Sequence, residues 1–369
     1  MKLVALFNAG LEKLVKNELK SNGINSMENS RGMIFFDGDL DLIYKLNLNS
    51  RLIEKILICV GEFKAETYDE LFDNIYSLNW YDFIKKDDGV IINKISSKRS
   101  KLFSEKTIQS IVQKAIYKKL MDKYSLNYIQ ENSKINIRIY SFKDNFMILL
   151  DTTGIPLSKR GYRKLISQAP LKETLAASLL FFSHWKRKYP LYDPFCGSGT
   201  IPIEAASYAF NIPPGINRNF DFSLLKNFDV DLFNIIKKDL KGKINTSYEI
   251  NIFGSDKEQH MIETSFKNSE YYEINDKINF YKCSMEEIRN KGFDFGYVIS
   301  NPPYGERYRD SNYAIKIYEQ MRFFHKEFKN WNYCFITSRD DFEKHFNLKA
   351  TFKKGISNGK MNNIIYYFK

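Results

Sequence analysis

The sequence has few residues that could hold a metal ion or form a disulfide framework. Its four cysteines, Cys59, Cys196, Cys283 and Cys334, lie far apart, without the short paired spacing of a zinc site or a disulfide-rich domain. The four histidines are isolated as well. We therefore expect no metal and no disulfide framework, and a reducing cytoplasmic location.

Long hydrophobic runs are also missing. The longest extends from Leu175 to Phe182 and is broken by Ser178, far short of the roughly 20 apolar residues that cross a bilayer. The segment from Met1 to Leu14 interrupts its apolar residues with polar and charged ones, unlike a signal peptide. We expect a soluble protein with no membrane partner.

Acidic side chains are too few to balance the basic ones: 44 Asp and Glu stand against 56 Lys and Arg, a net charge of +12. Residues 94–165 alone hold 16 basic and five acidic side chains, a net charge of +11 that leaves +1 for the rest. A concentration of this kind suits a partner with a phosphate backbone. A lysine-rich solvated surface is the alternative.

The amino-terminal pattern predicts two small α+β units. Over residues 1–64 a ferredoxin-like unit is expected, with strands at Lys2–Phe7, Gly32–Phe36 and Ile53–Phe63 and a helix at Leu40–Leu48 among its elements. Residues 65–151 predict a second unit, with helices at Tyr68–Ser77 and Ser104–Leu120 and strands at Val90–Ile95, Ile135–Tyr140 and Phe146–Leu150. A basic linker follows at residues 152–170.

From Leu171 onward helices and strands alternate, which predicts a doubly wound parallel sheet. The stretch Leu191–Thr200 reads as a short strand ending in Asp193, a turn with Gly197 and Gly199, and a helix start. Glycines without a Cβ let a ligand approach the backbone, and a helix amino terminus offers free N–H groups. The pattern predicts a nucleotide-type pocket at the carboxyl end of a strand.

A second strand, predicted at Phe293–Ser300, leads into Asn301-Pro302-Pro303-Tyr304. Consecutive prolines fix the backbone and remove N–H donors, so the Asn301 side chain and the Pro302 carbonyl become rigid hydrogen-bond acceptors. Such acceptors can hold and orient an exocyclic amine, and Tyr304 can stack on the base that carries it. The predicted catalytic residues are therefore Asn301, Pro302, Pro303 and Tyr304. The alternative is that this stretch only breaks the strand and forms a loop.

Together these two loops resemble the amino-group-directed class I methyltransferases, and more closely the THUMP-containing bacterial 23S ribosomal RNA (guanine-N(2)) methyltransferases in their single-methyltransferase form. Other matching stretches are Lys159–Arg163, Ala169–Ala177 and Tyr304–Arg307. The likeness spans essentially all 369 residues. It implies a Rossmann-like α/β methyltransferase domain at residues 171–369, preceded by an α+β region of ferredoxin-like and THUMP units that binds RNA.

The resemblance also implies S-adenosylmethionine as cofactor and gives its site. Asp193 would face the methionyl amino group, Asp256 the ribose hydroxyls, and Thr174 the methionyl carboxylate. The expected cofactor-binding residues are Thr174, Asp193, Pro194, Cys196, Gly197, Gly199, Thr200, Asp256 and Ser284. Ser284 departs from the family, which usually has an acidic residue there for the adenine amino group, and a hydroxyl accepts without charge assistance.

Basic residues of the second unit and the linker are the candidates for contact with RNA phosphates: Lys98, Arg99, Lys101, Lys106, Lys114, Lys159, Arg160 and Arg163. The leading hypothesis is methyl transfer to a guanine 2-amino group of 23S ribosomal RNA. Transfer RNA is the second substrate considered. Adenine in DNA or a glutamine side chain would also suit the Asn-Pro-Pro-Tyr loop but leaves the basic region unexplained. A non-catalytic RNA-binding or assembly factor is the third hypothesis.

Overall fold

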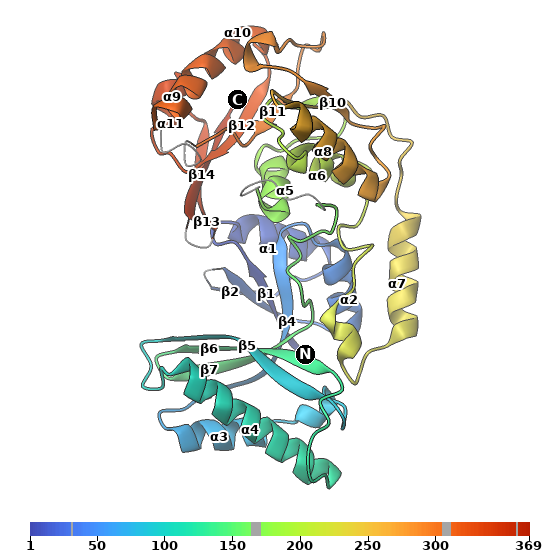
Figure 1. Ribbon diagram of the computed structural model, residues 1–369, viewed down its shortest axis with the longest axis vertical. Coiled ribbons are helices and arrows are strands. Elements are labelled where there is room, and N and C mark those ends of the chain that lie inside the picture. Colours follow the sequence, from blue (N-terminus) through green and yellow to red (C-terminus); the bar gives the residue numbers. More distant parts are fainter. Residues whose placement is uncertain (31, 164–170, 305–310, 359–360) are drawn as a thin grey trace.

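The computed structural model describes residues 1–30, 32–163, 171–304, 311–358 and 361–369. These residues form two seven-stranded sheets, one in each half of the chain. Figure 1 shows them along the long axis of the molecule, with the carboxy-terminal sheet at the top. The predicted class, an α/β sheet domain preceded by an α+β region, is confirmed.

The amino-terminal half contains β1 (Lys2–Phe7), α1 (Glu12–Ser21), β2 (Glu28–Ser30), β3 (Met33–Asp37), α2 (Leu40–Asn49), β4 (Ile53–Lys64), α3 (Tyr68–Ser77), a 3-10 turn (Trp80–Asp82), β5 (Gly89–Lys98), α4 (Glu105–Tyr124), β6 (Lys134–Phe142) and β7 (Asn145–Asp151). Its strands lie in the order β2-β3-β1-β4-β7-β6-β5. Only β5 and β6 pair in parallel. Strand β2 was not predicted, because its residues are exposed and show no apolar alternation.

Strand β4 connects the two predicted amino-terminal units. Its first residues pair with β1 and its last with β7, and the register shifts between Cys59 and Gly61. The two units therefore share one continuous sheet. Helices α3 and α4 cover this sheet at its lower end in Figure 1. The boundaries at residues 64, 151 and 170 stay predictions, and residues 164–170 of the linker lie outside the described residues.

The carboxy-terminal half contains α5 (Glu173–Phe182), β8 (Leu191–Asp193), α6 (Thr200–Ala209), α7 (Val230–Gly242), β9 (Ile252–Asp256), α8 (Gln259–Ser269), β10 (Asn279–Lys282), β11 (Tyr297–Ser300), α9 (Ser311–Gln320), α10 (Phe324–Glu327), β12 (Asn332–Thr337), α11 (Phe342–Phe346), β13 (Phe352–Asn358) and β14 (Met361–Phe368). Short 3-10 turns lie at Asp221–Leu224, Glu270–Tyr272, Met285–Glu287 and Met321–Phe323.

Strand order in this sheet is β10-β9-β8-β11-β12-β14-β13. The first five strands are parallel, and β14 is antiparallel to β12 and β13, as the sequence predicts for a terminal hairpin. Strand β11 is shorter than predicted, beginning at Tyr297 rather than Phe293. The Asn290 side chain bonds both the N–H and the carbonyl of Phe293, which takes these groups away from the strand ladder.

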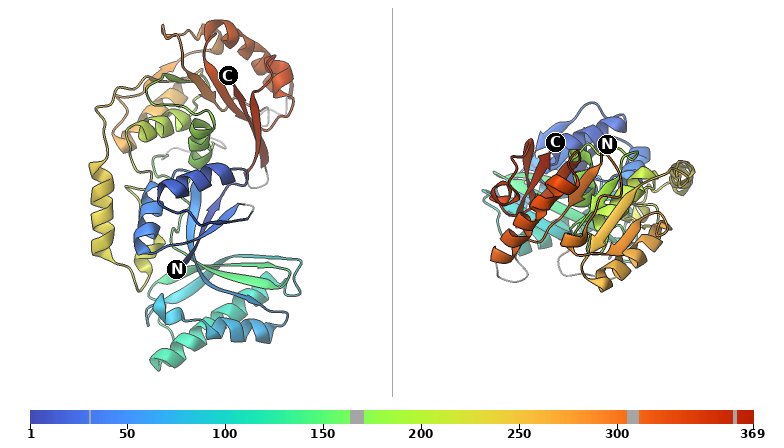
Figure 2. Two further views of the ribbon diagram at one scale, coloured as in Figure 1. Left: turned by 180° about the vertical axis from the view of Figure 1, so that it is seen from behind. Right: turned by 90° about the horizontal axis from the view of Figure 1, so that it is seen from above.

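The insertion at residues 211–249 holds the two halves of the chain together. Gly215 N donates to the Leu48 carbonyl at 2.8 Å, and Lys226 N donates to the Phe83 carbonyl at 2.8 Å. Helix α7 lies alongside α2, as both views from the side show (Figures 1 and 2). The insertion therefore contacts both amino-terminal units, a role that its sequence did not indicate.

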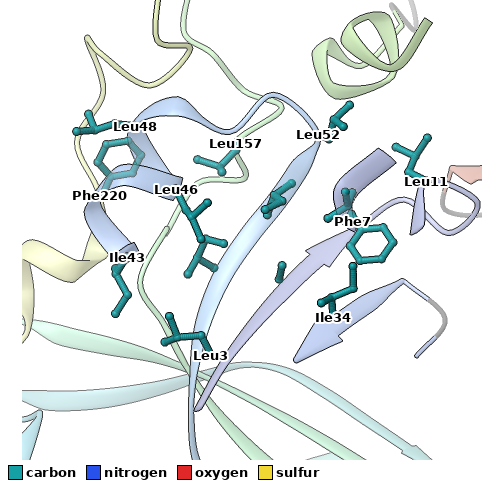
Figure 3. Packing of buried hydrophobic residues seen from close by; sticks show 14 of the residues in the cluster. Leu3, Phe7, Leu11, Ile34, Ile43, Leu46, Leu48, Leu52, Leu157 and Phe220 are labelled. Carbon is teal, nitrogen blue, oxygen red and sulfur yellow. The ribbon is translucent and has the colours of Figure 1, made fainter. Parts of the chain in front are cut away.

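The hydrophobic core crosses the predicted domain boundaries. Figure 3 shows Leu157 from the linker and Phe220 from the insertion packed near Leu46 and Leu48 of α2. All four side chains are buried. Since apolar burial is the main favourable term in folding, the carboxy-terminal half and the amino-terminal half are fixed to each other by packing.

Candidate active site

The turn after β8 brings the chain close to open space. Gly197 and Gly199 have φ of +52° and +82°, in the region that disfavours residues with a Cβ. A Cβ at Gly197 would meet nothing within 4 Å, whereas one at Gly199 would lie 3.0 Å from Ser265. Gly199 is thus required by packing as well as by the turn, and Gly197 borders a space that a ligand can enter.

Helix α8 supports this turn from below. Ser265 Oγ donates to the Gly197 carbonyl at 2.7 Å, and Asn268 Nδ2 donates to the Ser198 carbonyl at 3.0 Å. Both side chains are buried, and they follow Ile262 on the same helix face, Ser265 after one turn and Asn268 after almost two. Neither residue was predicted as part of the site; the signal in the sequence is that both are polar residues in an apolar helical stripe.

The two predicted loops converge at the carboxyl ends of two neighbouring strands. Strands β8 and β11 are neighbours, with Val298 opposite Tyr192. Ser300, the last residue of β11, donates its hydroxyl hydrogen to Asp193 Oδ1 at the end of β8. This hydrogen bond joins residues 107 positions apart and places the Asn301 loop directly beside the glycine turn.

Asp193 is the most perturbed carboxyl group of this rim. It is 1% exposed, and it accepts hydrogen bonds from Ser300 Oγ and from Phe195 N, the latter at 3.1 Å. Burial raises the pKa of Asp193 to about 7, opposed by these two hydrogen bonds and increased by the nearby Asp256 charge. No ion pair neutralises Asp193 within the described residues. A cationic ligand would restore its ionised form.

Asp256 ends β9 on the other side of the glycine turn. Gly197 N donates to Asp256 Oδ2 at 3.1 Å, and Glu258 N donates to Oδ1 at 3.0 Å. Burial raises the pKa of Asp256, and both hydrogen bonds oppose that shift. Each carboxylate oxygen can accept a second hydrogen, so Asp256 keeps the capacity to accept from two hydroxyl groups.

The loop from Asn301 to Tyr304 is ordered by its own side chains. Tyr304 donates its hydroxyl hydrogen to Asn301 Oδ1, and Pro302 between them is buried. An amide oxygen has two lone pairs, so Asn301 Oδ1 keeps one for a substrate amine. The next residues of the matching stretch, Gly305, Glu306 and Arg307, lie outside the described residues.

Ser284 follows β10, as predicted, and its hydroxyl hydrogen is donated within the chain. Ser284 Oγ donates to Glu287 Oε2 at 2.8 Å, and Ser284 N donates to the same oxygen at 2.9 Å, forming a capping box. These hydrogen bonds lower the pKa of Glu287. Contact between Ser284 and an adenine stays a prediction.

Thr174 lies at the contact between the two halves. It is fully buried, and its hydroxyl donates to Glu54 Oε1 at 2.6 Å while Asn8 Nδ2 approaches it at 3.4 Å. Both neighbours belong to the amino-terminal half. Thr174 therefore links the two halves, and its contact with a methionyl carboxylate stays a prediction.

Two arginines that were predicted to contact RNA are corrected by their burial. Arg160 is 1% exposed, pairs with Glu204 at 3.4 Å and donates to the carbonyls of Leu157 and Arg51 at 2.8 Å and 2.7 Å. Its guanidinium has no access to a phosphate. Arg160 therefore stabilises the contact between the two halves of the chain.

Arg163 lies at the cofactor side of the same junction. Its side chain is 9% exposed and donates to Thr200 Oγ1 at 2.9 Å and to the Leu171 carbonyl at 2.8 Å, with Glu173 at 3.6 Å. Arg163 therefore supports the first residue of α6, and the predicted contact with RNA does not fit its burial.

The other basic candidates are exposed: Lys98, Arg99, Lys101, Lys106, Lys114 and Lys159. Lys101 forms an ion pair with Glu66. Cys196 and Pro194, predicted at the cofactor, are buried in the glycine turn, and burial raises the pKa of the Cys196 thiol, which argues against a reactive thiolate.

Among the described residues, no cluster of three or more His, Cys, Asp or Glu side chains could hold a metal ion. None of the described helices combines the length and the apolar character needed to cross a membrane.

Three protein families match successive parts of the chain. Residues 2–57 match the RlmL ferredoxin-like domain, residues 65–151 the THUMP domain, and residues 160–366 the RMKL-like methyltransferase domain. The last match covers more than half of the chain. The chain belongs to the RMKL-like methyltransferase family.

Relatives of this methyltransferase family are similar over most of the chain. A tRNA (guanine(6)-N2)-methyltransferase of Methanocaldococcus jannaschii is 34% identical over 85% of this chain and 83% of its own length. The ribosomal RNA large subunit methyltransferase K/L of Buchnera aphidicola subsp. Acyrthosiphon pisum is 29% identical over 100% of this chain, which spans only 54% of that protein.

Solved structures agree with these relatives. The protein SMU.472, solved in complex with SAH, has a TM-score of 0.94 and 34% identity and covers 100% of this chain and 97% of its own. A structure from Listeria monocytogenes str. 4b F2365 is named as an N6-adenine-specific DNA methylase. It has a TM-score of 0.93 and 33% identity, and the match covers 100% of this chain and 96% of that one. The names of such relatives thus differ in substrate.

Proposed function

We propose that this protein transfers a methyl group from S-adenosylmethionine to the exocyclic 2-amino group of a guanine in RNA, with 23S ribosomal RNA as the leading substrate. The observation that carries the proposal is the hydrogen bond between Ser300 and Asp193, because it brings a donor-binding turn and an amine-binding loop to one rim. The THUMP match and the relatives named for guanine-N2 chemistry support RNA as the substrate.

The residues of the rim suit this cofactor. Gly197 leaves open space where a Cβ would stand, and Asp193 is a buried carboxylate with no ion pair among the described residues. Asp193 would attract the cofactor's ammonium group, and Asp256 would accept from its ribose hydroxyls. Bound there, S-adenosylmethionine supplies an activated methyl group on a sulfonium.

Positioning is the main contribution of the second loop. Asn301 Oδ1 and the Pro302 carbonyl accept the hydrogens of the target amine and direct its nitrogen toward the methyl group. Tyr304 stacks on the guanine, which must leave its helix to reach the rim, since a base in a stack hides its reactive atoms. A strong general base is not required, because the methylated amine loses its proton readily.

The decisive experiment compares Asn301→Ala with the wild-type protein, using labelled S-adenosylmethionine and unmodified 23S RNA. The proposal expects loss of methyl transfer by about 100-fold or more, with cofactor affinity retained. Tyr304→Phe removes only the hydroxyl and keeps the ring, so it serves as a milder matched variant beside Tyr304→Ala. Absence of label with folded wild-type protein that binds the RNA would defeat the proposal.

Transfer RNA is the second candidate substrate. It is favoured by the relative named as a tRNA (guanine(6)-N2)-methyltransferase, which matches this chain at 34% identity. Mass spectrometry of nucleosides from separated ribosomal and transfer RNA of a deletion strain discriminates the two. Loss of N2-methylguanosine from one fraction identifies the substrate, and its loss from neither contradicts both.

A further inference from the structure

One end of the THUMP unit combines exposed aromatic rings with cations. This surface, the basic tip, consists of the end of β5, the loop that leads to α4, and the turn between β6 and β7. Its members are Lys98, Arg99, Lys101, Phe103, Phe142, Lys143 and Asp144. In Figure 1 the strands β5, β6 and β7 lie above α3 and α4 at the lower end of the molecule.

Hydrogen bonds hold the parts of the tip together. Lys143 N donates to the Lys98 carbonyl at 3.2 Å, and the hydroxyls of Ser100 and Ser141 lie 2.8 Å apart. Lys98 and Phe142 are also register partners in the parallel pairing of β5 and β6. The position of Phe142 is therefore set by the strand ladder rather than by packing into a core.

The turn that follows Phe142 is tight and specific. Lys143 and Asp144 have φ of +50° and +64°, the left-handed values expected at both central residues of a two-residue hairpin turn. Asp144 N donates to Ser100 Oγ at 3.0 Å, and Asp144 Oδ1 accepts from Lys101 N at 2.6 Å. The loop before α4 and the hairpin turn thus form one unit.

Two phenylalanines of the tip remain in water. Phe103 is 77% exposed and Phe142 is 52% exposed, while Leu102 beside Phe103 is only 5% exposed. Cations lie over the Phe142 ring, with the Arg99 guanidinium 6.0 Å and the Lys143 ammonium 5.6 Å from its centroid. Aromatic faces beside cations offer a nucleotide both a stacking surface and neutralisation of its phosphate.

We propose that the basic tip binds unpaired nucleotides of the RNA substrate, whose bases stack on Phe103 and Phe142. Lys98, Arg99 and Lys143 contact the adjoining phosphates. Unpaired nucleotides are specified because a duplex keeps its base faces inside the stack, where exposed phenylalanines gain nothing. That the ligand is RNA rests on the proposed function, whereas the demand for exposed base faces comes from the tip itself.

The test measures binding of the full-length protein to two labelled RNAs, a single strand of about 12 uridines and a blunt duplex of the same length. Phe103→Ala and Phe142→Ala should each weaken single-strand binding about fivefold or more and leave duplex binding unchanged. Phe103→Trp should retain single-strand binding, because it keeps an aromatic face at this position. Tyr128→Ala is the matched control, since Tyr128 is 67% exposed in the same THUMP match but carries none of the tip's cation contacts.

Salt dependence separates stacking from charge. Phe103→Ala should leave the slope of log affinity against log salt unchanged, whereas Lys98→Ala should reduce it by about 0.7. Equal losses for both RNAs, or no loss for either, would overturn the inference. Binding needs no methyl transfer, so a protein that stacks single strands on Phe103 but methylates no RNA would refute the proposed function and leave this inference intact.

Discussion

Two groups of buried charges occupy different places in this protein and differ in how they are neutralised. In the junction group Arg51, Arg160 and Glu204 are buried and Glu18 is partly buried, so two cations stand beside two anions. The rim carboxyl of Asp193 is equally buried, yet it meets only a hydroxyl and a backbone N–H. A buried charge whose partner is supplied within the chain is structural, and one whose partner must come from outside marks a binding site.

The junction group joins the two halves of the chain. Glu18 accepts from Arg51 N at 2.7 Å, while the Arg51 guanidinium donates to the carbonyl of Ile212 at 2.7 Å. Burial lowers the pKa of Arg51, and the nearby Glu204 opposes that shift. These contacts run between α1, the start of β4 and the end of α6, so they fix the amino-terminal half against the helix that begins at the glycine turn.

The largest expected effect breaks the junction group. Arg160→Met removes the cation that pairs with buried Glu204, and should lower the free energy of unfolding by about 3 to 5 kcal/mol. Lys159→Met is the matched control. Lys159 is next to Arg160 in the chain but its side chain is exposed, so the change should alter stability by less than about 0.5 kcal/mol. Denaturant unfolding followed by circular dichroism measures both.

Adding Glu204→Gln to Arg160→Met tests the same point further. The double variant should be less destabilised than the sum of the two single changes, because neither charge then remains unpaired. Additive losses would show that Arg160 and Glu204 do not act on each other, and the contrast with Asp193 would fail.

The next effect concerns the rim. Asp193→Asn should weaken binding of S-adenosylmethionine on the order of 100-fold, since the cofactor's cation loses its carboxylate. The same change should not lower the free energy of unfolding at pH 8, because it removes an unneutralised buried charge. Calorimetric titration and denaturant unfolding of the same samples measure the two quantities, with exposed Asp239→Asn as control. Retained affinity in Asp193→Asn would place the cation elsewhere.

The pH dependence of cofactor binding follows from the raised pKa of Asp193, which is about 7. Below that pH the free protein holds a proton that the cofactor must displace. Affinity for S-adenosylmethionine should therefore fall by up to about tenfold per pH unit between pH 7 and pH 5.5. Asp193→Asn should bind weakly at all these pH values and show no such slope.

The stability of the free protein carries the opposite sign. A carboxyl group whose pKa is raised on folding favours the folded state while protonated. The Asp193 contribution is thus present below its unfolded pKa of 3.8 and is lost as the pH rises to about 7. The difference in unfolding free energy between wild type and Asp193→Asn should accordingly grow in favour of the variant over that range.

The smallest effect separates the two glycines of the turn. Gly197→Ala should cost about 1 to 2 kcal/mol of stability through its left-handed backbone alone, because its Cβ meets no protein atom. It should also weaken cofactor binding severalfold by filling the open space. Gly199→Ala should destabilise the fold more, because its Cβ would press on Ser265. Thermal unfolding and calorimetry measure the pair, and equal stability costs would contradict the assignment.

The sequence could predict the elements that carry chemistry, because glycine spacing, an acidic strand end and paired prolines act locally. It placed Asp193, Asp256 and Asn301 at strand ends, and β8, β9 and β11 confirm that placement. Partners that lie far apart in the sequence were not predictable, because nothing near Arg160 in the chain indicates that it will pair with Glu204. Lysine and arginine counts likewise cannot separate a buried guanidinium from an exposed one.

The most direct measurement is a carbon-13 NMR titration of the Asp193 carboxyl, in the free protein and with saturating S-adenosylmethionine, assigned by comparison with Asp193→Asn. The account predicts a pKa near 7 in the free protein and a fall of about 1 to 3 units when the cationic cofactor binds. A pKa of Asp193 that stays the same with the cofactor bound would contradict the claim that this carboxyl group binds the cationic group of the cofactor.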